Sequence, residues 1–82
     1  DAIHHYQAAI KLNPKKAESF YNLGNAQCVK SEYAEAIKSY QTALEIDPKN
    51  APALYNQGNA LYMMNRYEEA VQSYIRALAI ND

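Results

Sequence analysis

The sequence predicts an all-α protein, a solenoid of antiparallel helix hairpins with five helices in total. Three observations predict this fold. The stretch from Ala17 to Pro48 recurs from Ala51 to Asp82, apolar residues recur at helical spacing inside each repeat, and proline or asparagine stands at the ends of the apolar runs. A unit of this length buries its apolar side only by stacking on its neighbours, so the repeats are expected to form one continuous array.

The repeat is found by comparing the chain with itself. When Ala17 is aligned with Ala51 and Pro48 with Asp82, fourteen of the aligned pairs are identical. The identical pairs include Tyr21/Tyr55, Asn22/Asn56, Gly24/Gly58, Asn25/Asn59, Ala36/Ala70, Tyr40/Tyr74 and Leu44/Leu78. The start of the chain, up to Lys16, matches the second half of a unit in the same way. We therefore divide the array into the second helix of a truncated repeat (1–16), one unit at 17–50 and one unit at 51–82.

Helix ends follow from residues that start or stop a hydrogen-bonded ladder. The expected helices are 2–12, 17–30, 33–46, 51–64 and 67–80. Pro14 and Pro48 end helices because proline has no amide hydrogen. Asn50 is expected to cap the helix that follows it, with proline tolerated in the first turn. Asn65, with Glu68 three positions later, resembles a capping box for the last helix.

Glycine inside a helix lowers helix stability, so its recurrence at Gly24 and Gly58 requires a packing reason. We expect close approach of the partner helix, with Ala36 and Ala70 opposite the glycines. The tyrosines that recur at equivalent places of the repeat, Tyr6, Tyr40 and Tyr74, would then fill the spaces between successive hairpins.

Composition excludes several classes of function. Eight basic and nine acidic residues give a net charge of −1, without the basic excess that nucleic-acid binding requires. The longest uncharged stretch, 50–65, is too short and polar to span a bilayer. A single cysteine excludes an internal disulfide framework. No signal peptide or lipidation motif is present, so we expect a cytoplasmic, intracellular protein. The start at an aspartate rather than methionine suggests an excised segment.

Catalytic and metal-binding constellations are not found in the sequence. His4 and His5 are adjacent on a helix and point about 100° apart, so they cannot share a metal with local partners. Cys28 has no histidine or second cysteine nearby to activate it. Glu68 and Glu69 stand at a helix start, where acidic residues favour the helix dipole. We therefore expect no enzymatic activity, no metal and no cofactor.

The residues of each unit resemble the tetratricopeptide repeat (TPR) family. The matching residues of the first unit are Phe20, Leu23, Gly24, Ala36, Tyr40, Ala43 and Pro48, and those of the second are Leu54, Gly58, Leu61, Ala70, Tyr74 and Ala77. Gln27, Gln57 and Asp82 depart from the pattern. The resemblance implies a right-handed superhelical stack that binds other polypeptides. Fold alone does not specify which partner is bound.

The resemblance also implies a binding groove. In the TPR family the first helix of each hairpin lines a concave surface. The residues that correspond to this surface, and that we predict to bind a peptide, are Tyr21, Asn22, Asn25, Tyr55, Asn56, Asn59 and Tyr62. A carboxamide both donates and accepts hydrogen bonds, which suits the backbone of an extended peptide. Tyrosine supplies apolar walls and hydroxyl groups.

Equivalent asparagines of the two units form two rows, Asn22 with Asn56 and Asn25 with Asn59, and two alternatives stay open for these asparagine rows. They contact a ligand directly, or they link neighbouring hairpins by side-chain hydrogen bonds. Family members that bind acidic chaperone tails carry a lysine where this chain has Tyr21 and Tyr55. Without that charge, an acidic tail loses its main charge-assisted hydrogen bonds. The expected ligand is therefore an extended segment that is not strongly acidic.

A scaffold without a ligand of its own is the alternative function. Terminal repeats of an array normally carry polar caps, and neither end of this chain looks capped. We expect Ile3, Tyr6 and Ile10 to be exposed at one end, and the final helix to expose Tyr74, Ile75 and Leu78 at the other. Exposed apolar surfaces of this kind promote association, so self-association through the terminal helices is predicted.

Overall fold

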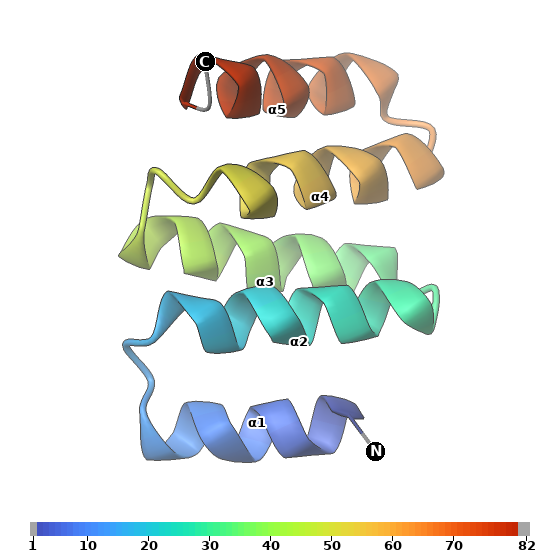
Figure 1. The fold of residues 1–82 in the computed structure, drawn as a ribbon. Coiled ribbons are helices and arrows are strands. Elements are labelled where there is room, and N and C mark those ends of the chain that lie inside the picture. Colours follow the sequence, from blue (N-terminus) through green and yellow to red (C-terminus); the bar gives the residue numbers. More distant parts are fainter. Residues whose placement is uncertain (1, 81–82) are drawn as a thin grey trace.

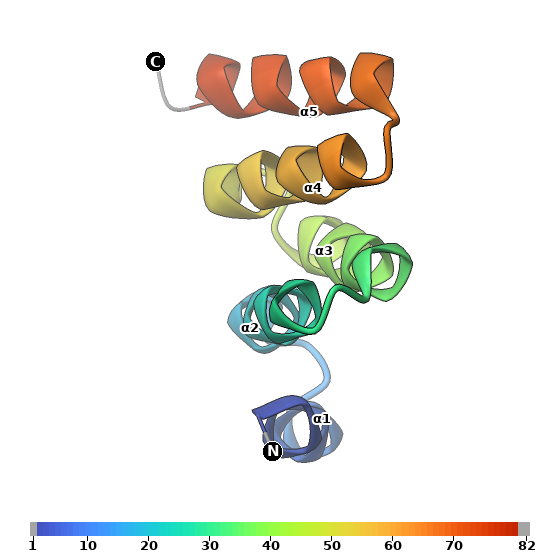
Figure 2. The ribbon, with the colours of Figure 1, turned by 90° about the vertical axis from the view of Figure 1, so that its right-hand side faces the viewer.

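The computed structural model describes residues 2–80 and consists of five antiparallel helices stacked in chain order (Figure 1). The helices are α1 (Ala2–Leu12), α2 (Ala17–Val29), α3 (Tyr33–Ile46), α4 (Ala51–Met63) and α5 (Tyr67–Ile80). Three of them have the predicted bounds, whereas α2 and α4 each end one position early. The axes turn along the stack, so that Figure 2 shows α1 and α2 end-on but α5 from the side. No helix within residues 2–80 is long and apolar enough to cross a membrane.

The ends of α2 and α4 share one backbone motif. Ser31 and Asn65, which occupy the same place in the two units, both adopt a left-handed conformation, with φ of 62° and 64°. The amide of Glu32 donates to the carbonyl of Gln27 at 2.8 Å, and that of Arg66 donates to Leu61 at 2.9 Å. This 6→1 hydrogen bond is the Schellman motif, which closes a helix and satisfies carbonyls that have no partner in the ladder. It explains why both helices end where they do.

The predicted capping box at Asn65 and Glu68 is therefore wrong. Asn65 ends α4, and its side chain accepts a hydrogen bond from the Tyr67 hydroxyl at 2.7 Å. Asparagine is favoured both before a helix and in the left-handed position after one, so its identity alone does not separate the two roles. The cap predicted at Asn50 is confirmed, because its Oδ1 accepts the Ala53 amide at 3.2 Å.

The two helical glycines make room for tyrosine rings. A Cβ built on Gly24 would lie 2.5 Å from Cε1 of Tyr40, and one on Gly58 would lie 2.6 Å from Cε1 of Tyr74. The partner helix does approach closely, as predicted. The atoms that require the glycine belong to a ring one turn beyond Ala36, however, rather than to the alanine. Each hairpin is thus closed by a glycine–tyrosine contact.

The core lies between the hairpins as well as within them. Tyr40 and Leu54 are the largest fully buried side chains. Tyr40 of α3 packs with Ala53 of α4, which belongs to the next hairpin. A second cluster joins Ile37 of α3 to Ala60 and Leu61 of α4. The hairpins therefore share one hydrophobic core and form a continuous array.

The two ends of the stack differ in exposure. Ile3, Tyr6 and Ile10 are half-buried rather than exposed, which corrects the prediction for the first helix. α1 packs against α2, and that contact covers much of its apolar side. At the other end Ile75 and Leu78 are exposed as predicted, while Tyr74 is half-buried. Of the two terminal helices, α5 exposes more large apolar side chains than α1, namely Tyr67, Val71, Ile75, Leu78 and Ile80 against Leu12.

Replacing Gln57 by leucine is expected to raise the free energy of unfolding by about 1 kcal/mol, because an unpaired buried polar group is costly. Gln57 is buried and its Oε1 has no hydrogen-bond partner. Gln27 is equally buried, but its Oε1 accepts the Ser39 hydroxyl at 2.7 Å. Urea denaturation followed by circular dichroism measures both variants. Gln27→Leu is the matched control. It should destabilise the protein, since it leaves the buried Ser39 hydroxyl without its hydrogen-bond acceptor. A loss of stability in Gln57→Leu would contradict this account.

Candidate functional site

The seven residues predicted to bind a peptide lie on the first helices of the two hairpins. Tyr21, Asn22 and Asn25 are on α2, and Tyr55, Asn56, Asn59 and Tyr62 are on α4. The two helices are in direct contact although α3 separates them in sequence. The asparagines of α2 and those of α4 therefore lie on neighbouring helices.

Hydrogen bonds between the hairpins occupy Asn25 and Asn56. Nδ2 of Asn56 donates to the Tyr21 hydroxyl and to Oδ1 of Asn25, both at 3.0 Å. The Tyr40 hydroxyl donates to the same Oδ1 at 2.6 Å. Asn25 therefore accepts two hydrogen bonds, one from α3 and one from α4. For these two asparagines the structure shows the linking role, which was one of the two alternatives.

The protonation of Tyr40 supports this network. Burial, and next the hydrogen bond with the Cys28 thiol, raise the pKa of the phenol well above its ordinary value. Sγ of Cys28 lies 3.6 Å from the hydroxyl. The phenol therefore stays protonated, and its hydroxyl can donate the hydrogen bond to Oδ1 of Asn25. Burial, followed by the neighbouring Tyr55 and Tyr62, also raises the pKa of Tyr74.

Tyr55, Asn59 and Tyr62 present the accessible part of the predicted site. The exposed fractions of Tyr55 and Tyr62 are 55% and 56%, and Asn59 is also exposed. The Tyr55 ring lies 5.4 Å from that of Tyr74, measured between centroids. Oδ1 of Asn59 accepts the Tyr74 hydroxyl at 2.5 Å. The Tyr62 ring lies 5.1 Å from that of Tyr67, and all three side chains remain exposed and accessible to a ligand.

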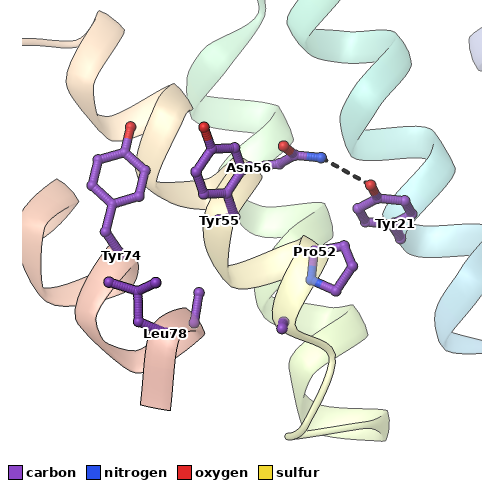
Figure 3. Close-up of a pocket in the computed structure, with 8 residues that line it drawn as sticks. Tyr21, Pro52, Tyr55, Asn56, Tyr74 and Leu78 are labelled. Atoms are coloured by element: carbon purple, nitrogen blue, oxygen red, sulfur yellow. Dashed lines mark hydrogen bonds between the residues drawn. The ribbon is translucent and has the colours of Figure 1, made fainter. Parts of the chain in front are cut away.

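A pocket of about 540 Å³ adjoins this surface, and α2, α4 and α5 line it (Figure 3). Its lining residues are Tyr21, Ala51, Pro52, Tyr55, Asn56, Tyr74, Ala77 and Leu78. None of them is charged. Figure 3 shows the rings of Tyr55 and Tyr74 beside one another, with Leu78 near them. Three of the seven predicted residues line the pocket, and the contribution of α5 was not predicted.

A second pocket, of about 480 Å³, lies at the start of α5 and is lined by Asn65, Arg66, Tyr67, Glu68 and Glu69. Within residues 2–80, no group of three or more His, Cys, Asp or Glu side chains could hold a metal ion. The Arg66 guanidinium pairs with Glu69 on the surface and lowers the pKa of that carboxyl. An exposed pair of this kind contributes little to stability.

Comparison with family models decides the classification. A TPR repeat model matches residues 1–28 and 28–65, and a tetratricopeptide repeat model matches residues 51–82. The chain belongs to the tetratricopeptide repeat family. TPR domains are general modules of protein–protein interaction, and they are typically non-enzymatic. No curated protein sequence matched the chain.

Solved TPR structures share the fold along almost the whole chain. The TPR domain of Arabidopsis OM64 is 32% identical, with a TM-score of 0.94 over 96% of this chain and 65% of that one. MamA is 27% identical, with a TM-score of 0.92 over 95% of this chain and 46% of that one. The second TPR of Spaghetti (RPAP3), bound to the HSP90 peptide SRMEEVD, is 24% identical, with a TM-score of 0.92 over 95% of this chain and 72% of that one. The chain thus spans less than two thirds of the OM64 structure.

Proposed function

We propose that this TPR array binds an extended segment of a partner protein along the concave groove. The groove is formed by Tyr21, Asn22, Asn25, Tyr55, Asn56, Asn59 and Tyr62. The observation that carries the proposal is the open surface of α4, where Tyr55 and Tyr62 are more than half exposed and Tyr55 lines an uncharged pocket. Exposed aromatic residues next to a concave surface are typical of binding sites. The proposed function is non-enzymatic.

The groups in the groove match a peptide backbone. Asn59 already accepts the Tyr74 hydroxyl through Oδ1, which leaves its Nδ2 to donate to a peptide carbonyl. The Tyr55 and Tyr62 rings supply flat apolar surface on either side of Asn59 along α4. A segment with small or apolar side chains at alternating positions would suit this spacing.

The ligand is expected to carry few acidic residues. The TPR of RPAP3 is described with the peptide SRMEEVD, which contains three acidic side chains. Family members that bind acidic chaperone tails carry lysine at the two positions where this chain has Tyr21 and Tyr55. The residues that line the pocket include no cation either. A carboxylate placed there would lose its water without gaining a charged partner. We therefore propose a neutral segment.

The double variant Tyr55→Ala/Tyr62→Ala tests this function. Both side chains are exposed, so the fold should persist while groove surface is lost. Partners captured from lysate by the native chain should bind the variant at least about tenfold more weakly, as expected when aromatic contacts at the centre of an interface are removed. Asn25 and Asn56 are unsuitable targets, because their loss would also weaken the link between hairpins.

The control is Ile46→Ala/Ile75→Ala, which removes exposed apolar groups from the second helices of the hairpins. It should capture partners at the native level. Helicity of both variants is compared first by circular dichroism. Equal losses in the two variants, or none in the groove variant, would contradict the proposal.

A scaffold role is the second candidate. The observation in its favour is that Oδ1 of Asn25 and Nδ2 of Asn56 already form hydrogen bonds with groups of the chain itself. Such a segment would retain its partners in the groove variant and lose them in the Ile46→Ala/Ile75→Ala control. Self-association through α1 has less support, since Ile3, Tyr6 and Ile10 are half-buried.

A further inference from the structure

Two exposed tyrosine rings meet at the turn between α4 and α5. The Tyr62 ring lies 5.1 Å from the Tyr67 ring, measured between centroids, and their planes are inclined by 65°. The exposed fractions of the two residues are 56% and 51%. The Tyr67 hydroxyl donates to Oδ1 of Asn65, which holds this ring beside the end of α4. We name residues 62–69 the α4–α5 tip, and the equivalent residues 28–35 the α2–α3 tip.

The exposure of the α4–α5 tip does not come from its place at the end of the stack. The α2–α3 tip belongs to a hairpin on which the next hairpin packs, and both tips lie along the same edge of the array (Figure 1). Val29, the equivalent of Met63, is nevertheless 86% exposed, and Ser31 is exposed too. Tyr33, the equivalent of Tyr67, stays half-buried rather than buried. Stacking therefore leaves the tip of a hairpin accessible.

The two tips differ in chemistry at equivalent positions. A ring is added at one position, a lysine is lost at the second, and a carboxylate is added at the third. These differences are Cys28/Tyr62, Lys30/Met64 and Ala34/Glu68. Each of them makes the α4–α5 tip a better environment for a cation than the α2–α3 tip, because aromatic faces and carboxylates attract positive charge.

The fourth difference, Arg66 in place of Glu32, supplies a cation that is already paired. Its guanidinium donates to both carboxylate oxygens of Glu69, and the bond from Nη2 is 2.8 Å long. Within residues 2–80, no ion pair involves Glu68. Glu68 and Tyr67 line the same pocket of about 480 Å³. The tip thus combines two accessible rings with a carboxylate that has no cation of its own.

We propose that the α4–α5 tip binds an arginine side chain of the partner polypeptide. A guanidinium stacks on aromatic faces and donates paired hydrogen bonds to a carboxylate, so one group engages both the rings and Glu68. A purely apolar side chain would cover Glu68 without offering it a partner, which is unfavourable. The proposal rests on the proposed function, since the arginine belongs to the segment in the groove and Tyr62 lies in both sites. The remainder of that segment is neutral.

The probe is N-acetyl-arginine methylamide, added to the native full chain at constant ionic strength. Amide chemical shifts measured by NMR follow its binding up to about 100 mM, because single exposed contacts of this kind are weak. Saturable shifts are expected at residues 62–69. The matched probe is the citrulline analogue, which has nearly the same shape but no charge. It should bind about threefold more weakly or less well still. Equal binding of the two probes would overturn the proposal.

Variants of the chain separate the ring, the hydroxyl and the carboxylate. Tyr67→Leu and Glu68→Gln should each weaken binding of the arginine probe about threefold. Tyr67→Phe keeps the ring and should bind at the native level, although it loses the hydrogen bond to Asn65. Glu35→Gln is the matched control at the α2–α3 tip and should leave binding unchanged. These side chains are exposed, so the variants should fold. Native binding by Tyr67→Leu or Glu68→Gln would overturn the proposal.

The titration needs no partner protein, so it can fail independently of groove binding. Loss of partner capture in Tyr55→Ala/Tyr62→Ala, together with no saturable shift from the arginine probe, would support the groove and overturn the arginine site. Saturable shifts at residues 62–69 with undiminished capture by that variant would support the tip as an arginine site and contradict the groove.

Discussion

Replacing Leu54 by alanine is expected to cost about 3 kcal/mol of unfolding free energy, because a fully buried leucine loses its transfer energy and leaves a cavity. Leu54 is 0% exposed and is one of the two largest side chains that are fully buried. A domain of this size buries a modest share of its surface, so such a loss is a large part of its total stability. Urea denaturation monitored by circular dichroism measures the change.

Leu78→Ala is the matched control for this prediction. Leu78 has the same side chain but is largely exposed on α5, so its replacement should change stability by no more than about 0.5 kcal/mol. Similar losses in the two variants would show that α5 is covered in solution, contrary to the described fold. The pair therefore tests where the hydrophobic core ends.

Replacing Gly24 by alanine is expected to cost about 2 kcal/mol, although alanine favours a helix by about 1 kcal/mol over glycine. The added Cβ would lie 2.5 Å from the ring of Tyr40, which is 1% exposed and held by its hydrogen bond to Asn25. A shift of the buried ring would disturb its packing with Ala53 of α4. The measurement is again the free energy of unfolding in urea.

Gly58→Ala separates the effect of the ring from that of the glycine. Its Cβ would lie 2.6 Å from the ring of Tyr74, a nearly identical overlap. Tyr74 is half-buried at the end of the stack and borders the open pocket, so its ring can shift. The loss should be less than half of that for Gly24→Ala. A larger loss in Gly58→Ala would mean that Tyr74 is as firmly held as Tyr40.

Much of the fold could be predicted from the sequence because the repeat supplies the same information more than once. Helical spacing of apolar residues located all five helices, and the cap at Asn50 followed from its position before Ala51 and Pro52. The end of α4 was missed at Asn65. The repeat itself indicated this helix end, since the equivalent residue, Ser31, adopts the same left-handed conformation at the end of α2.

The site was less predictable, because hydrogen-bond direction depends on the packing of three helices. The sequence placed Asn25 and Asn56 on one surface, but it could not decide whether a ligand or the neighbouring hairpin satisfies them. The structure gives the linking role to both. The final helix was predicted to expose Tyr74 and Leu78, and the pocket that they form with Tyr55 depends on how α2, α4 and α5 pack together.

The most direct test of the central claim, binding in the concave groove, is site-specific photo-crosslinking to a captured partner. A photoreactive phenylalanine derivative replaces Tyr62, which is exposed on α4, or Gln41, which is exposed on α3. The account predicts cross-links from position 62 to one extended stretch of the partner and none from position 41. Cross-links from position 41 alone would contradict it, because the partner would then lie against the second helices and not in the groove.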